Sequence, residues 1–322
     1  MIVTTQSGTM GSHPGEDLKG YLAAAAAIGF WSINVIVARY FAGKLPPAEI
    51  TMWRWMVACC ALLPFAIKPV QAAWPDMRRR PLFYCGLLLG MGIFRVALLN
   101  TLIYKAGETA KAIDMALIGT SGPIFLALLG HFVLGQDVSK RQVLGYAITV
   151  FGVLVLILHG DFERLRQMHF VAGDLWTLGS ALCFAIYSTM LGYRPHTLSP
   201  VALLMLSGVI GLILVLPFGV AEMAQRNHQL PDFYDLGILA YLGLFPSLVS
   251  FFCWNMALER LGSTRAGLIY YLLPVLSSIE AYLLLDETFT ASQVLGGLMV
   301  LGGVLYASLH RQTHPVAGPS TT

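Results

Sequence analysis

Four ionisable side chains of this sequence lie deep inside long apolar runs, where a charge is costly. They are Arg95, Asp114, His131 and Glu280. A charged group at the centre of a bilayer costs about 2.5–3.5 kcal/mol on insertion scales, so it persists where it is paired, hydrated or used. We therefore expect these side chains to face the interior of the protein. The planar guanidinium of Arg95 suits a substrate carboxylate or phosphate, and an ion pair with Asp114 or Glu280 is the alternative.

Asp114 and Glu280 are also candidates for proton coupling. Burial disfavours the charged form of a carboxylate and can bring its proton exchange close to neutral pH. The alternative for each is a structural ion pair with Arg95. Lys111 shares a helix face with Asp114 and lies near the start of its run, so we expect its ammonium group to extend to water.

His131 and Glu287 lie near the ends of apolar runs, and we expect a structural role for both. His131 is interpreted as an interfacial histidine. Glu287 is interpreted as a cap of the next helix or as a partner in a surface pair, rather than as a substrate ligand.

Polar and aromatic side chains at mid-depth complete the candidate substrate site. A mostly apolar pocket with a few placed polar groups is typical of small-molecule sites. The alternative for each residue is a bond between helices or ordinary packing. The predicted substrate-binding residues are Trp31, Asn34, Arg95, Asn100, Tyr187, Trp254, Asn255, Tyr270 and Tyr271.

These residues must be positioned by helices that cross a membrane. The chain is 57% hydrophobic and 11% charged, whereas a soluble domain carries about 25% charged residues. A bilayer-spanning helix needs about 20 mostly apolar residues, and ten such runs are present: 18–42, 47–68, 81–104, 108–134, 139–159, 171–194, 199–224, 235–260, 264–286 and 290–311. The sequence therefore predicts an all-α membrane protein with ten transmembrane helices. Polar tails at 1–17 and 312–322 are expected to be disordered.

The second half of the chain repeats the first. Gln142–Gly145 (QVLG) recurs as Gln293–Gly296, an offset of 151 residues (293 against 142), and Gly152–Leu154 (GVL) recurs as Gly303–Leu305. The predicted repeats are 18–160 and 161–311, with five spans each. Because five is an odd number, the second repeat must enter the bilayer upside down. Two inverted repeats around a midplane cavity are the construction of many secondary transporters.

Pro123 and Pro274 lie at the same offset, each inside an apolar run. A proline removes one backbone hydrogen bond and bends its helix. We interpret the pair as hinges or as fixed kinks that shape the cavity.

Composition and motifs exclude several other classes of protein. The net charge of +3 is too small to indicate nucleic-acid binding, and the five cysteines lie in apolar runs without CxxC spacing. The HExxH, GxSxG and P-loop motifs are absent. We therefore expect no metal, no cofactor and no enzymatic activity.

Gly86-x-x-x-Gly90 is interpreted as close packing inside a monomer, with a weak homodimer as the alternative. Lys and Arg favour an arrangement with both termini in the cytoplasm.

A set of short motifs resembles the drug/metabolite transporter superfamily in its EamA-type ten-helix form. The second half holds the better match, and the residues are Ala257-Leu258, Gly262, Ala266, Leu273-Pro274-Val275, Glu287, Gly296 and Gly303-Val304. The first half is similar at Gly107, Pro123, Gly135, Gly145 and Gly152, and Arg54 resembles an arginine often found in the second helix. Gln136 replaces the family glutamate in the first half, and Asp286 replaces the glycine before Glu287.

The resemblance implies a ten-helix carrier of small organic metabolites, commonly an exporter, in the plasma membrane of a bacterium. We therefore predict a secondary active transporter, a probable exporter of a small organic metabolite such as an amino acid, that works by alternating access around a midplane cavity. Proton coupling through Asp114 or Glu280 and substrate exchange are the two options for its driving force. A passive channel or facilitator and a non-transporting membrane receptor are the alternative functions.

Overall fold

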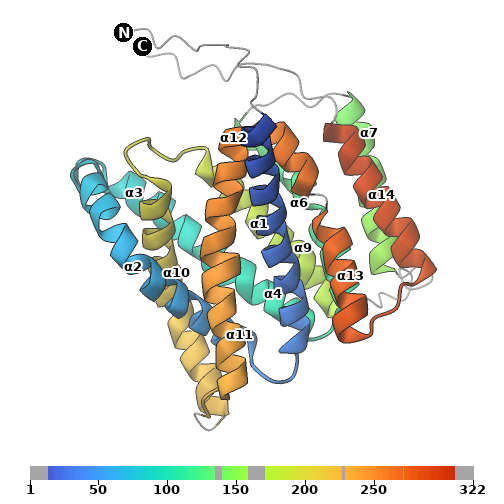
Figure 1. The fold of residues 1–322 in the computed structure, drawn as a ribbon, viewed down its shortest axis with the longest axis horizontal. Helices are drawn as coiled ribbons and strands as arrows, with labels where there is room; N and C mark the ends of the chain where they lie inside the picture. The colour runs from blue at the N-terminus through green and yellow to red at the C-terminus, as the bar shows by residue number, and fades with distance from the viewer. Residues whose placement is uncertain (1–13, 135–139, 159–170, 227–228, 271, 309–322) are drawn as a thin grey trace.

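The computed structural model describes residues 14–134, 140–158, 171–226, 229–270 and 272–308 as a bundle of helices, with no β-strand in these ranges (Figure 1). The helices of the first half are α1 Pro14–Tyr40, α2 Pro47–Arg79, α3 Pro81–Met91, η1 Gly92–Leu98, α4 Leu99–Gly107, α5 Ala112–Gly119, α6 Gly122–Leu134 and α7 Lys140–Ile157. Those of the second half are α9 Ala172–Leu191, α10 Pro200–Gln225, α11 Phe233–Leu244, η2 Phe245–Val249, α12 Ser250–Tyr270, α13 Leu273–Leu285 and α14 Ala291–Ser308.

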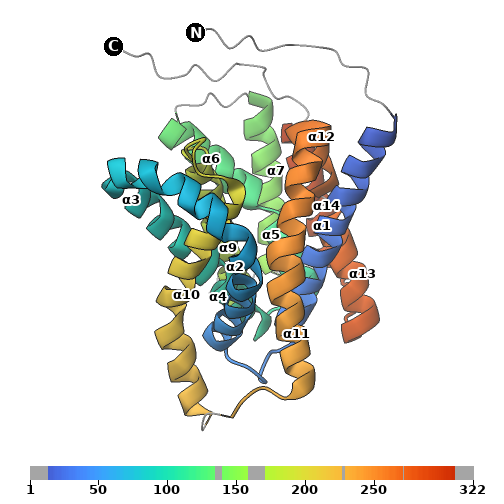
Figure 2. The same cartoon turned by 60° about the vertical axis from the view of Figure 1, so that its left-hand side comes forward.

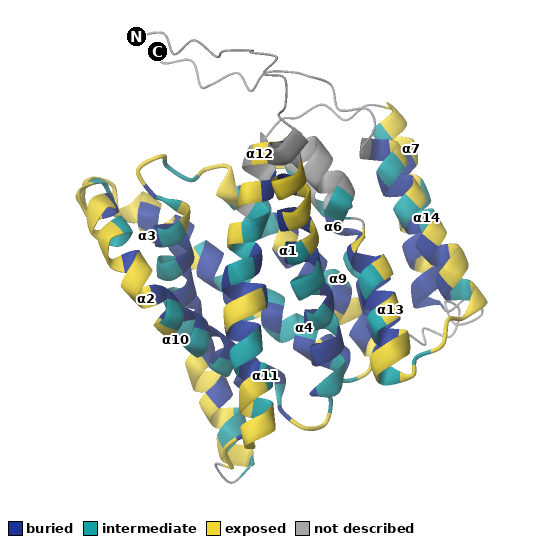
Figure 3. Cartoon of the chain, in the orientation of Figure 1, coloured by how far each residue is buried: buried dark blue, intermediate teal, exposed yellow. Residues whose placement is uncertain are grey.

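Six of these helical segments are long and apolar enough to cross a membrane, and α13 and α14 are shorter apolar helices. Figure 3 shows exposed residues along the outer faces of α2, α11 and α13. Large apolar side chains are prominent among the exposed residues: Leu82 is 88% exposed, Phe132 78% and Phe218 66%. So much exposed apolar surface fits contact with lipid. The chain is thus an all-helical integral membrane protein.

The helix α2 is longer than the sequence predicts, because it continues past residue 68 to Arg79. Pro64, Pro69 and Pro75 lie inside it. Each proline removes one backbone donor, but packing holds the helix on both sides. Ala73, beyond the first two prolines, is fully buried in a cluster with Tyr84.

Two helical segments change to π-helix near the middle of the bundle. They are η1, between α3 and α4, and η2, between α11 and α12. Val96 of η1 and Leu248 of η2 lie in one buried cluster with Trp55 of α2. The two π-helical segments therefore meet α2 in the interior, and π-helices are frequent at functional sites.

Polar side chains donate additional hydrogen bonds to carbonyl groups of the π-helical segments. The Asn100 amide nitrogen donates to the carbonyl of Arg95 at 2.9 Å, five residues earlier. The Ser250 hydroxyl donates to the carbonyl of Phe245 at 3.0 Å, again five residues earlier, and the Ser250 backbone nitrogen donates to the same carbonyl. Both π-helical segments therefore carry the same contact between a side chain and the backbone.

Two helices break shortly before the mid-span prolines. Instead of lying in a bent but continuous helix, Pro123 and Pro274 are each the second residue of a new helix, α6 and α13. Proline is favoured there because the first turn of a helix does not use its amide hydrogens. The predicted spans 235–260 and 264–286 leave a break around Gly262, but α12 runs through that residue to Tyr270. A single glycine costs only about 1 kcal/mol in a helix, so it does not by itself end one.

The bounds of equivalent helices repeat the sequence offset. The helices α6 and α13 start 151 residues apart (122 and 273). The duplicated sequence therefore folds into duplicated helices in this part of the chain.

Glycines allow α7 and α14 to cross closely side by side. A Cβ atom at Gly145 would lie 2.6 Å from the carbonyl oxygen of Gly303, and one at Gly152 would lie 2.9 Å from that of Gly296. The earlier glycine of α7 thus meets the later glycine of α14, and the later one meets the earlier. The two equivalent helices therefore run antiparallel (Figure 1).

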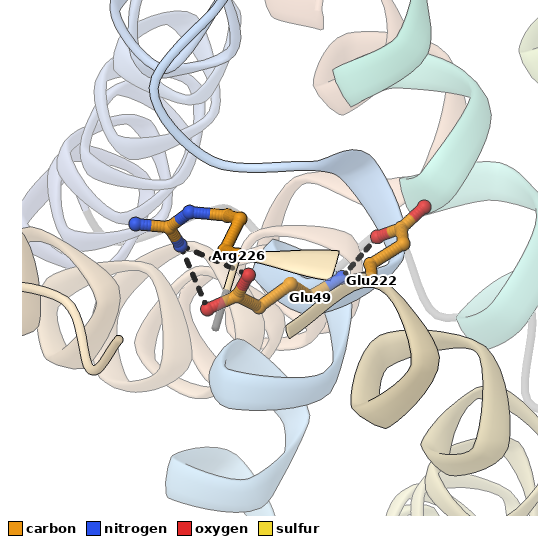
Figure 4. Close-up of polar contacts among 3 residues, drawn as sticks. All are labelled: Glu49, Glu222 and Arg226. Atoms are coloured by element: carbon orange, nitrogen blue, oxygen red, sulfur yellow. Dashed lines mark hydrogen bonds and ion pairs between the residues drawn. The ribbon is translucent and has the colours of Figure 1, made fainter. Parts of the chain in front are cut away.

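A buried ion pair ties the start of α2 to the end of α10 (Figure 4). Glu49 is fully buried, and Nη1 of Arg226 donates to its two carboxylate oxygens at 3.1 and 3.0 Å. The Glu222 carboxylate accepts a hydrogen bond from the Glu49 backbone nitrogen at 2.9 Å. Glu222 thereby caps α2, whose first amide groups have no partner within the helix.

The first residues of α1 and the last residues of α14 lie at one end of the bundle (Figures 1 and 2).

Substitution of Gly152 tests the crossing of α7 and α14. In Gly152→Leu, the new Cβ would lie 2.8 to 2.9 Å from atoms of Met299, Gly296 and Val300, two of them backbone atoms. Overpacking of this kind costs about 1–3 kcal/mol of folding stability. Gly302→Leu on α14 is the control, because a Cβ there meets nothing within 4 Å. Thermal unfolding in detergent should show a lower midpoint for Gly152→Leu only, and equal midpoints for the two variants would contradict the crossing.

Candidate functional site

Arg54 on α2 is the centre of a buried polar network that joins four helical segments. Its Nε donates to the Ser247 hydroxyl of η2 at 2.7 Å. Its Nη1 donates to Oδ1 of Asn34 on α1 at 2.9 Å and to the hydroxyl of Tyr104 on α4 at 2.8 Å. Arg54 is only 5% exposed, and all these partners are neutral. In the described ranges no carboxylate forms an ion pair with Arg54.

Arg95 on η1 is the second interior arginine, and aromatic rings surround it. Its guanidinium carbon lies 5.2 Å from the ring centre of Trp55, 5.4 Å from that of Tyr187 and 5.9 Å from that of Phe251. Its Nη1 donates to the Ser207 hydroxyl at 3.1 Å. Contacts of this kind attract a cation through the quadrupole of the ring. The cage holds Arg95 without neutralising its charge.

The expected alternative for Arg95, an ion pair with Asp114 or Glu280, is not formed between these described residues. Instead, Arg95 and Arg54 are close enough for their charges to repel each other. Two neighbouring interior cations with neutral partners form a region of uncompensated positive charge. Such a region favours an anionic group that arrives from outside the chain.

Three predicted aromatic residues form a cluster. The ring centres of Trp31 and Trp254 are 5.6 Å apart, and that of Tyr270 is 6.3 Å from Trp31 and 5.9 Å from Trp254. The Trp31 indole nitrogen donates to the carbonyl of Pro246 at 3.0 Å. Pro246 precedes Ser247, so η2 joins the aromatic cluster to the Arg54 network.

The two carboxylate oxygens of Glu280 on α13 differ, because one accepts a hydrogen bond and the other, the open oxygen, accepts none in the described structure. Its Oε1 accepts a hydrogen bond from the Ser32 hydroxyl at 2.7 Å. Its Oε2 is buried without a hydrogen-bond partner in the described structure. The Tyr241 side chain is within electrostatic range of both Glu280 and Arg54. Its buried hydroxyl also lacks a hydrogen-bond partner among the described residues. These three groups therefore border one region.

Asp114 lies in a different environment, on α5. It is 1% exposed, and its Oδ1 accepts a hydrogen bond from the side chain of Gln293 on α14 at 2.8 Å. The buried Asp174 of α9 is within range of its charge. The structure thus separates the two proton-coupling candidates: Glu280 shares the region of Arg54, and Asp114 belongs to the contact between α5 and α14.

The remaining predicted residues, the other substrate-site candidates and the two mid-span prolines, do not form one group in the described structure. Asn100 donates to the carbonyls of Arg95 and Val96, so it supports η1, and its contact with substrate stays a prediction. The side chains of Asn255 and Pro123 and the whole of Tyr271 lie outside the described residues. Pro274 is buried at the start of α13.

Glu287 caps a helix, as expected, but not the next one. Its two oxygens accept hydrogen bonds from the backbone nitrogens of Ala112 and Ile113 at 3.0 and 3.2 Å. The capped helix is α5 of the first half, because the end of α13 lies beside its start in space. Lys111 is exposed, as expected for a lysine near the start of a helix. His131 is exposed too, so the expectation that it faces the interior is wrong, and its place near the end of α6 agrees with an interfacial histidine.

The site predicted from the sequence does not include Arg54, although this residue resembles an arginine often found in the second helix of the family. Its position could have indicated a role, because Arg54 lies inside an apolar run just as Arg95 does. Tyr104 and Ser247 gave no such signal. A tyrosine or a serine in an apolar helix is common, and only the fold brings these two to the guanidinium.

The assembled groups suit the binding of a small organic anion or zwitterion. Two guanidinium groups can hold a carboxylate, and the open oxygen of Glu280 can hold a cation or a proton. The aromatic faces of Trp31, Trp254 and Tyr270 can pack against an apolar part. Among the described residues no group of three metal-ligating side chains comes together.

The chain is similar along most of its length to bacterial transporters. The uncharacterized transporter YyaM of Bacillus subtilis (strain 168) is 26% identical over 276 residues, which cover 84% of this chain and 88% of that protein. A probable amino-acid metabolite efflux pump of Escherichia coli (strain K12) is 27% identical over 298 residues, which cover 89% and 93%. A protein of known crystal structure shares the fold, with a TM-score of 0.57 and 18% identity over 92% of this chain and 98% of that one.

The sequence pattern of the EamA-like transporter family matches twice, over residues 18–158 and 171–309. One match lies in each predicted half, and together they span most of the chain. The family and these named relatives are transporters and not enzymes. This membrane protein therefore belongs to the EamA-like transporter family.

Proposed function

We propose that this transporter is a secondary active carrier that exports a small organic metabolite with a carboxylate group, such as an amino acid. The observation that supports this most is the pair of interior arginines, Arg54 and Arg95, whose hydrogen-bond partners are neutral. An uncompensated buried charge is expensive, so a site that keeps two of them gains when an anion binds. The name of the Escherichia coli relative, a probable amino-acid metabolite efflux pump, agrees with this substrate class.

The bound substrate would use both kinds of charge. Its carboxylate would lie against Arg54 and Arg95, and a substrate ammonium group would reach the open oxygen of Glu280. The side chain of an amino acid would then face Trp31, Trp254 and Tyr270. In this arrangement the substrate fills a midplane cavity between the two halves of the chain.

The proposed architecture is ten membrane spans in two inverted halves. The antiparallel crossing of α7 and α14 supports it, because these helices are equivalents in the two halves. The pairing of the other helices is consistent with the same two-fold relation. The helix α1 packs on α12, and α9, the equivalent of α1, packs on α4. The helix α4 is the equivalent of the first part of α12, because the two helices start 151 residues apart (99 and 250). The equivalents α2 and α10 also pack on each other.

Alternating access would use the irregular backbone. The helices break before α6 and before α13 at equivalent places, and such breaks let one half of a span turn against the other. We propose that these breaks act as hinges while the arginines stay on the rigid α2 and η1.

The bundle would lie in a bacterial plasma membrane with both termini in the cytoplasm, as a monomer or weak homodimer.

Arg95→Gln tests the anionic site. A hydrogen bond to a charged group contributes about 1.5–3 kcal/mol, so the apparent affinity for an amino-acid substrate should fall about 10- to 100-fold. The measurement is saturable efflux and counterflow of labelled amino acids in proteoliposomes. Arg78→Gln is the control, because Arg78 also lies over an aromatic ring, Trp74, but is exposed. Equal transport by Arg95→Gln and wild type for every transported compound would remove Arg95 from the site.

The same assay separates the carrier from its alternatives. A passive channel would give flux that does not saturate and shows no counterflow. A receptor would bind ligand without any flux. Either result would contradict the proposed mechanism, whatever the effect of Arg95→Gln.

Glu280→Gln tests the proposed proton site. If Glu280 takes up the coupling proton, the amide variant should lose accumulation driven by a pH gradient but retain substrate exchange between the two sides of the vesicle. Asp114→Asn is the comparison, because Asp114 is buried elsewhere and accepts a hydrogen bond from Gln293. Full pH-driven accumulation by Glu280→Gln would exclude Glu280 as the proton carrier. Loss in Asp114→Asn alone would assign that role to Asp114.

A further inference from the structure

An open cleft at the end of α1 has a strongly basic lining that the transport site does not use. The cleft encloses about 430 Å³ and is lined by Arg39, Tyr40, Ala42, Lys44, Lys111, Leu285 and Glu287. This volume lies in the range of small-molecule sites, about 300–1,000 Å³. Three cationic side chains and one carboxylate give the lining an excess of positive charge.

The single carboxylate of the lining is already engaged. Both oxygens of Glu287 accept backbone hydrogen bonds from the first turn of α5, from Ala112 and Ile113. Glu287 therefore compensates the positive end of that helix. It forms no ion pair with Lys44 or Lys111 in the described structure, so the lysine charges remain available.

The two lysines are presented to the solvent side of the cleft. Lys44 and Lys111 are both exposed. The Lys44 ammonium lies 3.6 Å from the ring centre of Tyr40, which fixes it at the rim. Asp235 and Asp232 act on Lys44 electrostatically without lining the cleft. Asp235 also accepts a hydrogen bond from the Tyr40 hydroxyl at 3.1 Å.

Arg39 forms the inner basic group of the cleft. Its Nη1 donates to the carbonyl of Gly107 at 3.1 Å, which leaves its other donors for a ligand. A guanidinium held in this way can bind a carboxylate or phosphate through two nitrogen atoms. One guanidinium held by a backbone carbonyl and two exposed ammonium groups can together bind an oxyanion.

We propose that this cleft is a second binding site, selective for a phosphate or carboxylate group, at one mouth of the protein. The shared ligand chemistry is an oxyanion, whether it belongs to a soluble metabolite or to the headgroup of an acidic lipid. The cleft is lined by the ends of α1 and α13 and by the residue before α5, and no residue of the Arg54 network or of the Arg95 cage lines it. The inference therefore stands apart from the proposed transport.

The experiment is a binding measurement without flux, on the full chain purified in an uncharged detergent. Inorganic phosphate is titrated at constant ionic strength against chloride, and short-chain phosphatidylglycerol is titrated against short-chain phosphatidylcholine. The readout is the saturable rise of the thermal midpoint, which a ligand that binds only the folded state produces. In Lys44→Gln/Lys111→Gln, the apparent dissociation constant should rise at least about tenfold, which corresponds to about 1.4 kcal/mol.

Lys105→Gln is the matched control. Lys105 is a half-exposed lysine on the same stretch of chain, but it pairs with Glu108 at 2.6 Å and does not line the cleft. Wild-type affinity in this control together with weak binding in the double variant supports the site. A response to phosphate identifies a soluble oxyanion as sufficient, and a response to phosphatidylglycerol alone identifies a lipid headgroup.

Two outcomes would overturn the proposal. One is the absence of any saturable response of the wild type to both ligands. The other is an equal loss of affinity in the double variant and in Lys105→Gln, since that would reveal only diffuse attraction to a basic surface. Both variants alter exposed side chains, so their midpoints without ligand should match the wild type and show that each is folded.

Discussion

The fold depends on how a guanidinium group is accommodated inside an apolar bundle. Arg54 cannot reach water, and lipid offers no partner, so its donors must be satisfied by the chain itself. Asn34, Tyr104 and Ser247 do so from three other helical segments. One side chain therefore links α1, α2, α4 and η2 through hydrogen bonds. Since these partners are neutral, the network satisfies the geometry of the guanidinium and leaves its charge uncompensated.

Irregular backbone is concentrated where this network lies. Both π-helical segments meet α2, and Asn100, Ser247 and Ser250 donate hydrogen bonds to carbonyl groups in these segments or just before them. The carbonyl of Pro246 in η2 accepts a hydrogen bond from the indole nitrogen of Trp31. The departures from the α-helix thus lie where polar side chains gather in the interior.

Equivalent parts of the two halves share structural elements but not their chemistry. Equivalent breaks, π-helical segments and glycine contacts occur in both. The charged groups do not repeat: Arg95 aligns with the region of Pro246, and Glu287 aligns with the region of Gln136. A symmetric frame with asymmetric charges agrees with a carrier that binds an asymmetric molecule, with acidic and basic groups recognised on different sides.

The sequence by itself determined the helical membrane class, the duplication and only part of the candidate site, mainly its charged and aromatic residues. Hydropathy, the offset of 151 residues (293 against 142) and the rarity of buried charge are local signals that need no coordinates. Only the tertiary structure decided the partners. It gave Arg95 an aromatic cage instead of Asp114, joined Glu287 to α5 and brought Ser247 to Arg54. The physical reason is that hydrogen bonds and ring contacts between distant helices depend on how the helices cross, and no local pattern records the rotation of one helix against another.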